Sequence, residues 1–153
     1  MKKLKADDPA PEFSGRDEDG NIITLNSLRG KRVILYFYPK DNTPGCTAEA
    51  CSLRDGRDEL EKMGFKIIGV SPDSEKSHKG FIAKHSLNFS LLADTDHTIA
   101  TDYGVWGEKK FMGRTYMGIL RTTFVIGADG NIEKVVEKVD TKRHLEQIVE
   151  MYK

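Results

Sequence analysis

The chain has 153 residues and a mass of 17.2 kDa, which is enough for one domain with a sizeable apolar core. Lysine plus arginine and aspartate plus glutamate each total 24 residues, so the formal net charge at pH 7 is zero. This balance gives no electrostatic reason to expect nucleic acid or an anionic membrane as a partner, and no stretch approaches the length of a membrane span. We therefore expect a single domain over residues 1–153 that binds neither.

The start of the chain, Met1-Lys-Lys-Leu-Lys5, has the positive charge of a signal peptide but not the apolar core that follows in one. A cytoplasmic protein is the resulting expectation. In that compartment two cysteines are more often used for thiol chemistry than for a structural disulfide. Secretion with a structural disulfide is the alternative.

The first half of the chain predicts two buried strands joined by a helix. Residues 1–12 are polar and are expected to run extended, and residues 22–25 follow a turn. Residues 32–38 form a continuous apolar run typical of a central strand, which Pro39 ends. Residues 44–62 have a helical pattern that Gly56 weakens, and residues 65–71 form a second buried strand. A strand, a helix and a strand in succession predict parallel pairing.

The second half predicts shorter elements and a closing helix. Its expected elements are a helix after residues 72–74 with Phe81, Ile82 and His85 on one face, a short strand at 90–93, a short helix at 97–103, a hairpin of residues 119–126 and 131–139, and a helix at 141–153 with Leu145, Ile148, Val149 and Tyr152 inward. The apolar loop at 105–118 is expected to fold back against the body. The pattern predicts an α/β sandwich, with helices on both faces of a mixed central sheet.

The chemistry is expected where the first strand gives way to the helix. Thr43 is a good N-cap and Pro44 suits the first helical position, so that Cys46 falls in the first turn. Unpaired backbone N–H groups and the positive end of the helix dipole favour a thiolate there. Because the thiolate is the nucleophilic form, this is where a reactive cysteine would be built.

The second cysteine, Cys51, lies five residues further along the chain. On a continuous helix this spacing turns the two side chains about 140° apart and separates their Cα atoms by roughly 8 to 9 Å. A disulfide tolerates at most about 7 Å. A bond between Cys46 and Cys51 would therefore require local unwinding, which Gly56 would ease.

The sequence resembles a known family at several positions. Pro39-Lys-Asp-Asn-Thr43-Pro-Gly-Cys46 matches the Pro-x-x-x-Thr-x-x-Cys signature of the peroxiredoxins. Cys51 matches the resolving position of the peroxiredoxin Q group, also called bacterioferritin comigratory protein. Residues 103–110, 116–118 and 121–126 are similar to that group as well, and the resemblance runs from about Asp8 to the C-terminal helix.

The resemblance implies a thioredoxin-like fold and thiol-dependent reduction of hydrogen peroxide and organic hydroperoxides, usually with thioredoxin as reductant. It implies that Cys46 is the peroxidatic and Cys51 the resolving cysteine, that Pro39, Thr43 and Arg121 complete the pocket, and that the protein is a monomer. No metal or other cofactor is expected. The residue types fit these roles, because Arg121 can hold a thiolate and the charge that develops on the departing oxygen. Thr43 can orient the peroxide or serve only as an N-cap, and Pro39 can shield the thiolate or only end the strand.

Two further residues have competing interpretations. Glu49, one turn after Cys46, could relay a proton or tune the pocket, but a glutamate on a helix surface is the commoner case. Trp106 could flank the site, as the family suggests, although an aromatic residue in such a loop more often fills the core.

Three other functions compete with the peroxidase. A non-peroxidase thiol oxidoreductase would normally carry Cys-x-x-Cys, whereas four residues separate these cysteines. A zinc module would need ligands among His78, His85, His97 and His144, none of which has ligand spacing. A holdase or scaffold would show a long exposed apolar segment or a coiled-coil repeat, and the sequence has neither.

Overall fold

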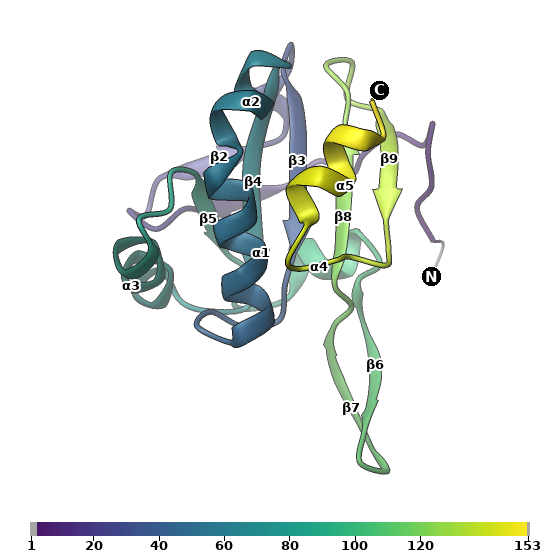
Figure 1. The fold of residues 1–153 in the computed structure, drawn as a ribbon. Helices are drawn as coiled ribbons and strands as arrows, with labels where there is room; N and C mark the ends of the chain where they lie inside the picture. Colours follow the sequence, from purple (N-terminus) through teal and green to yellow (C-terminus); the bar gives the residue numbers. More distant parts are fainter. Residues whose placement is uncertain (1–2, 153) are drawn as a thin grey trace.

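The computed structural model describes residues 3–152 of the chain, and within them seven strands form one mixed sheet (Figure 1). The strands are β1 (Ser14–Arg16), β2 (Ile22–Thr24), β3 (Arg32–Phe37), β4 (Phe65–Ser71), β5 (Ser90–Ala93), β8 (Thr122–Ile126) and β9 (Ile132–Val136). Their order across the sheet is β2-β1-β5-β4-β3-β8-β9. β3 runs parallel to β4 and β4 parallel to β5, while the remaining neighbours are antiparallel. The predicted mixed sheet is confirmed, with β9 at one edge.

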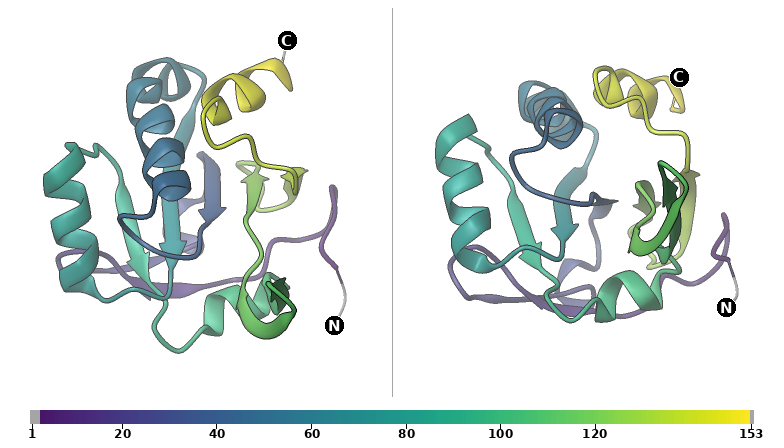
Figure 2. Two further views of the ribbon diagram at one scale, coloured as in Figure 1. Left: turned by 60° about the horizontal axis from the view of Figure 1, so that its bottom comes forward. Right: turned by 90° about the horizontal axis from the view of Figure 1, so that it is seen from below.

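Helices lie on both faces of this sheet, as predicted, but unequally (Figure 2). The helices are η1 (Asn26–Leu28), α1 (Pro44–Asp55), α2 (Arg57–Lys62), α3 (Glu75–His85), α4 (Thr98–Asp102) and α5 (His144–Glu150). α1, α2, α3 and α5 contribute to one core cluster, whereas η1 and α4 contribute to the other. No helix in residues 3–152 is long and apolar enough to cross a bilayer.

The central strand β3 supplies both cores because successive side chains of a strand point to opposite faces. Ile34 and Tyr36 pack under α1, while Val33 and Leu35 pack toward α4. A strand buried on both faces reads as a continuous apolar run, which is why residues 32–38 could be predicted.

The predicted helix 44–62 is two helices, because α1 ends at Asp55 and α2 begins at Arg57. The predicted closing helix is α5, although residue 153 lies outside the described residues. α5 packs across α1, with the Leu145 N–H donating to Ser52 Oγ at 3.1 Å. This contact brings the last helix of the chain over the helix that begins near Cys46.

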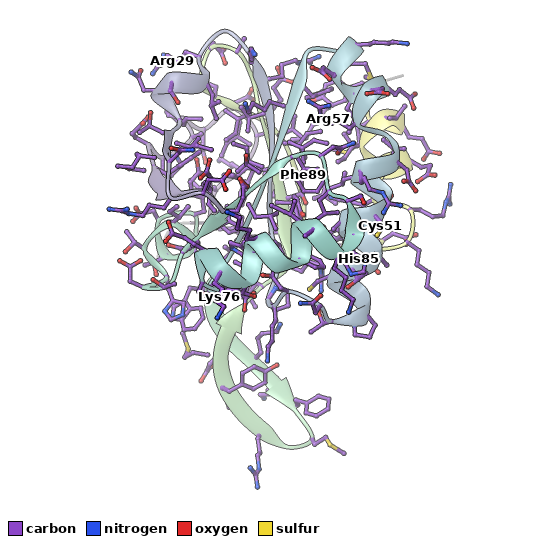
Figure 3. All side chains as sticks on the ribbon, turned by 90° about the vertical axis from the view of Figure 1, so that its left-hand side faces the viewer. Arg29, Cys51, Arg57, Lys76, His85 and Phe89 are labelled. Carbon is purple, nitrogen blue, oxygen red and sulfur yellow. The ribbon has the colours of Figure 1, made fainter. Side chains whose placement is uncertain are left out.

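The segment expected to fold back against the body instead forms a projecting hairpin (Figures 1 and 3). Its strands are β6 (Trp106–Phe111) and β7 (Arg114–Ile119), which pair only with each other. Phe111 is 66% and Met112 88% exposed. The prediction was wrong because the apolar residues were assumed to seek the core, whereas β6 and β7 pair with each other across the turn at Gly113 and leave Phe111 and Met112 exposed.

Candidate active site

Cys46 lies in the first turn of α1, where the sequence predicts it. Thr43 occupies the N-cap position with extended backbone, and its carbonyl accepts from the Thr47 N–H at 2.8 Å to open the helix. The Cys46 side chain is only 1% exposed and belongs to the core cluster under α1. Its sulfur is therefore shielded from bulk water and close to the positive end of the helix.

Arg121 provides the charge that faces this sulfur. It lies just before β8, so the sheet carries it to the start of α1 although 75 residues separate the two side chains in sequence. Its Nη2 donates to Cys46 Sγ at 3.1 Å, and its Nη1 donates to Glu49 Oε1. One planar guanidinium thus holds the sulfur and a carboxylate together.

Glu49 is completely buried, so its interpretation as a surface residue of the helix was wrong. Burial raises the pKa of its carboxyl to about 7, against the opposing effect of Arg121. A group with this pKa changes charge near neutrality beside the candidate nucleophile, which is a common property of catalytic sites.

A second cation lies close to Arg121 and was not predicted. Lys109 of β6 donates from Nζ to the Ile119 carbonyl at 2.8 Å. Partial burial, and then the positive charge of Arg121, lower the pKa of Lys109. The base of the projecting hairpin therefore adds positive charge to the surroundings of Cys46.

Thr43 is at the N-cap, but its hydroxyl does not cap the helix. Thr43 Oγ1 donates to the Lys40 carbonyl at 2.9 Å, and the side chain makes no hydrogen bond to the first turn. The hydroxyl proton of Thr43 is therefore committed to the Lys40 carbonyl, while the lone pairs of Thr43 Oγ1 can still accept a hydrogen bond. Pro39 lies two residues after the end of β3, half-buried at the start of the same loop.

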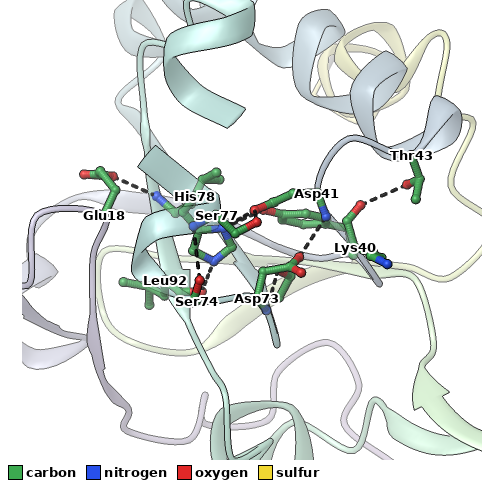
Figure 4. Close-up of polar contacts among 12 residues, drawn as sticks. Glu18, Lys40, Asp41, Thr43, Asp73, Ser74, Ser77, His78 and Leu92 are labelled. Atoms are coloured by element: carbon green, nitrogen blue, oxygen red, sulfur yellow. Dashed lines mark hydrogen bonds and ion pairs between the residues drawn. The ribbon is translucent and has the colours of Figure 1, made fainter. Parts of the chain in front are cut away.

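The loop between Pro39 and Thr43 is anchored by a buried ion pair that was not predicted (Figure 4). Asp41 Oδ2 lies 2.8 Å from His78 Nδ1, and the two side chains are 1% and 0% exposed. Tyr38 and Ser77 also donate hydroxyl hydrogen bonds to Asp41. Burial would raise the pKa of Asp41, but the hydrogen bonds from His78 and Tyr38 outweigh it and lower the pKa below its ordinary value.

From the hydrogen-bond partners of His78 we infer that both of its ring nitrogens donate. Its Nε2 lies 2.9 Å from the Leu92 carbonyl, which can only accept, so Nε2 carries a proton. Asp41 is ionised and can also only accept, so Nδ1 carries a proton as well. Asp41, Asp73 and His78 lie close enough together to hold a metal ion, but their facing atoms already bond to one another or to neighbouring protein groups.

Cys51 is half-buried on the same helix (Figure 3). Both thiols are free. α1 is unbroken from Pro44 to Asp55, so the spacing that opposes a disulfide applies in this state. Trp106 stacks on His97, with ring centroids 3.7 Å apart, and packs against the core on the α4 side. These contacts correspond to the core-filling interpretation of Trp106.

Together these residues form a thiol site. The buried Cys46 lies at the start of α1, and the guanidinium of Arg121 donates hydrogen bonds both to its sulfur and to the titratable carboxyl of Glu49. The chain belongs to the AhpC/TSA family, which matches residues 6–135.

Its relatives narrow this class further. The chain is 48% identical to peroxiredoxin Bcp of Escherichia coli K12, over 100% of this chain and 98% of the relative. It is 43% identical to peroxiredoxin Bcp of Bacillus subtilis 168, over 94% and 92% of the two chains. A cysteine variant of peroxiredoxin Q from Xanthomonas campestris has a TM-score of 0.89 at 33% identity, covering 97% of this chain and 98% of that one. The protein is accordingly a peroxiredoxin of the Bcp, or peroxiredoxin Q, group with a thioredoxin-like fold, and its class of activity is thiol peroxidase.

Proposed function

We propose that the Cys46 thiolate attacks hydroperoxides and that Arg121 is the group that activates it. The observation that carries this proposal is the 3.1 Å hydrogen bond from Arg121 Nη2 to Cys46 Sγ at the start of α1. A guanidinium and a helix start both stabilise the anionic sulfur, and the thiolate is the reactive form.

In the first step the sulfur of Cys46 attacks the terminal oxygen of RO–OH. The S–O bond forms while the O–O bond breaks, so that Cys46 becomes a sulfenic acid and the departing RO⁻ takes up a proton to become ROH. Arg121 faces the position where this charge develops. Thr43, whose hydroxyl proton is used on Lys40, accepts the hydrogen bond of the incoming hydroperoxide O–H, and Pro39 shields the thiolate from water.

Organic hydroperoxides are proposed as substrates alongside hydrogen peroxide. A related bacterioferritin comigratory protein from Xanthomonas campestris has a solved structure that concerns alkyl peroxide reduction, with a TM-score of 0.86 at 34% identity over 91% of this chain and 88% of that one.

In the second step the Cys51 thiol attacks the sulfenic sulfur of Cys46, which forms a disulfide and releases water. α1 has to unwind locally for this to happen. A dithiol such as thioredoxin then reduces the disulfide by thiol exchange and returns both cysteines to the thiol form. Because both cysteines lie in one chain, we propose that the cycle runs in a monomer, and in the cytoplasm, where reduced dithiols are maintained.

Stopped-flow peroxide reduction with the wild type and three variants tests this scheme. Cys46→Ser should abolish turnover, because it removes the nucleophile. Cys51→Ser should keep one round of sulfenic acid formation and lose recycling by thioredoxin. Arg121→Lys should slow the first step about tenfold to a hundredfold, because a single ammonium cannot serve both Cys46 and Glu49. Turnover by Cys46→Ser at the wild-type rate would refute the proposal.

A further inference from the structure

His144, the first residue of α5, lies beside the carboxyl of Glu49, a contact that was not predicted. The imidazole is completely buried. Its Nε2 is 2.8 Å from Thr123 Oγ1 on β8 and 3.5 Å from Glu49 Oε2 on α1. Through His144, α5 contacts Glu49, the carboxyl group that is bonded to the same guanidinium as Cys46.

The tautomer of His144 follows from its neighbour Gln147. Gln147 Oε1 accepts from the Asp140 N–H at 2.8 Å, and Gln147 Nε2 donates to the Lys138 carbonyl at 3.0 Å. The atom that lies 3.0 Å from His144 Nδ1 is therefore an acceptor, so Nδ1 carries the proton. Burial lowers the pKa of His144, which keeps the ring neutral near pH 7. Its Nε2 thus presents a lone pair, to which Thr123 donates.

Glu49 Oε2 lies 3.5 Å from this nitrogen and has no hydrogen-bond partner among residues 3–152. The groups around the carboxyl are Arg121 on Oε1, His144 from α5, Cys46 on its own helix, and Tyr36 from β3, whose pKa is raised by burial and then by the charge of Glu49. A protonated Oε2 needs an acceptor, and a shift of about 0.3 Å would bring His144 Nε2 within ordinary hydrogen-bond distance.

We propose that His144 is a positioning residue of the peroxidase site, which accepts a hydrogen bond from the protonated carboxyl of Glu49 and thereby leaves the charge of Arg121 to the sulfur of Cys46. This role rests on the proposed function of Cys46. One guanidinium faces two groups that can be anionic, so an ionised Glu49 competes with the Cys46 thiolate for it. A neutral Glu49 does not compete. His144 stabilises the neutral form because a hydrogen bond to a protonated carboxyl favours that form.

Three substitutions separate this role from simple packing. His144→Leu removes the acceptor and should lower the pKa of Glu49 by about 0.5 to 1 unit, the equivalent of one hydrogen bond. His144→Gln places an amide oxygen near the position of Nε2 and should restore most of this shift. Thr123→Val removes the competing donor at Nε2, strengthens the acceptor and should raise the pKa of Glu49. If the variants only disturbed packing, His144→Leu and Thr123→Val would not be expected to move the pKa of Glu49 in opposite directions.

The measurement is carboxyl ¹³C NMR of the reduced protein with labelled glutamate, with titration between about pH 5 and pH 9. In the wild type Glu49 should titrate at about 7. Rate constants for hydrogen peroxide over the same range should fall as Glu49 ionises, at a pH that moves with each variant. The ring ¹⁵N shifts of His144 should report the neutral Nδ1–H tautomer.

Identical Glu49 titrations in the wild type and His144→Leu would overturn the proposal, as would a downward shift in Thr123→Val. Carboxyl shifts that the rate constants do not follow would overturn the role in catalysis. The NMR titration needs no turnover, so it decides on the contact even if the protein reduces no hydroperoxide, a result that would refute the proposed function instead.

Discussion

Gly56, between α1 and α2, lies directly beneath Leu145 of α5. A Cβ atom on Gly56 would overlap Cγ and both Cδ atoms of Leu145. From the sequence, this glycine is a weak point of a long helix and an aid to its unwinding. The structure adds another reason for a glycine at this position: without a side chain at residue 56, α5 can pack over α1, the helix that carries both cysteines.

Replacement of Gly56 by alanine tests this contact. The backbone at Gly56 has a φ of −102°, which alanine adopts without strain, and helix propensity alone would favour alanine by about 1 kcal/mol. We expect the overlap with Leu145 to outweigh this gain and to destabilise the protein by roughly 1 to 3 kcal/mol in urea unfolding. Gly80→Ala in α3 is the control, because nothing lies within 4 Å of its added Cβ, and it should stabilise the protein by up to about 1 kcal/mol. Equal effects at both positions would rule out the contact.

Ser52→Ala should make α1 easier to unwind. Ser52 Oγ accepts from the Leu145 N–H at 3.1 Å and so ties the start of α5 to α1 one residue after Cys51. Loss of this bond should cost about 0.5 to 1.5 kcal/mol in the closed state, which favours the opening that lets Cys51 reach Cys46. We expect the Cys46–Cys51 disulfide to form about twofold to tenfold faster after a peroxide pulse, and less Cys46 to be overoxidised to sulfinic acid.

Rapid quenching with a thiol-alkylating reagent followed by mass spectrometry measures both products. Ser27→Ala is a matched control, because among residues 3–152 the Ser27 side chain bonds only to Thr24, the last residue of β2. It should leave both yields unchanged. Slower disulfide formation in Ser52→Ala than in the wild type would contradict the expectation that α5 restrains α1.

Much of this architecture could be predicted because the pattern is local. A continuous apolar run, an N-cap position and a proline at the first helical residue are all visible within residues 32–46. The burial of Glu49 also had a signal, because a residue three positions after Cys46 lies on the same face of the helix. That signal was outweighed by the general preference of glutamate for the surface.

The polar partners could not be predicted because they are brought together by the sheet. Thr123 and His144 meet Glu49 only once β8 lies beside β3 and α5 folds across α1. Likewise His78 reaches Asp41 from a helix that starts 34 residues further along the chain. A histidine or threonine in an otherwise ordinary helix or strand carries no mark of such a contact in the sequence.

Asp41→Asn should destabilise the protein strongly at neutral pH. It removes the carboxylate that balances the charge of His78 in a site from which water is excluded, and breaking a buried pair in this way costs about 3 to 5 kcal/mol. The pKa of Asp41 is lowered in the folded protein, so its contribution to stability is present above its ordinary pKa and is lost as the pH falls through the folded pKa. The difference between variant and wild type should therefore be large at pH 7 and shrink under strongly acidic conditions.

Urea unfolding at a series of pH values measures this difference. Asp55→Asn is the control, because Asp55 pairs with Arg54 at the surface and its side chain is 66% exposed. Exposed pairs contribute about 0 to 1 kcal/mol. If Asp41→Asn behaved like this control, the charged state inferred for His78 would be wrong.

Tyr36 and Tyr38 offer a direct comparison of two buried hydroxyl groups. Their rings stack with centroids 5.4 Å apart, and both side chains are essentially inaccessible. Tyr38 donates to Asp41 Oδ1 at 2.6 Å, whereas the Tyr36 hydroxyl has no partner among residues 3–152. A phenylalanine at either position keeps the ring and removes only the hydroxyl.

Tyr38→Phe should cost about 1.5 to 3 kcal/mol, because it removes a hydrogen bond to a charged group. Tyr36→Phe should leave stability unchanged or raise it by up to about 1 kcal/mol, because it removes a buried polar group that gains no bond on folding. Urea unfolding of the two variants under identical conditions gives both values. If Tyr36→Phe lost as much stability as Tyr38→Phe, the Tyr36 hydroxyl would have to donate a hydrogen bond to a charged group of the folded protein, and the contrast between the two hydroxyl groups would be wrong.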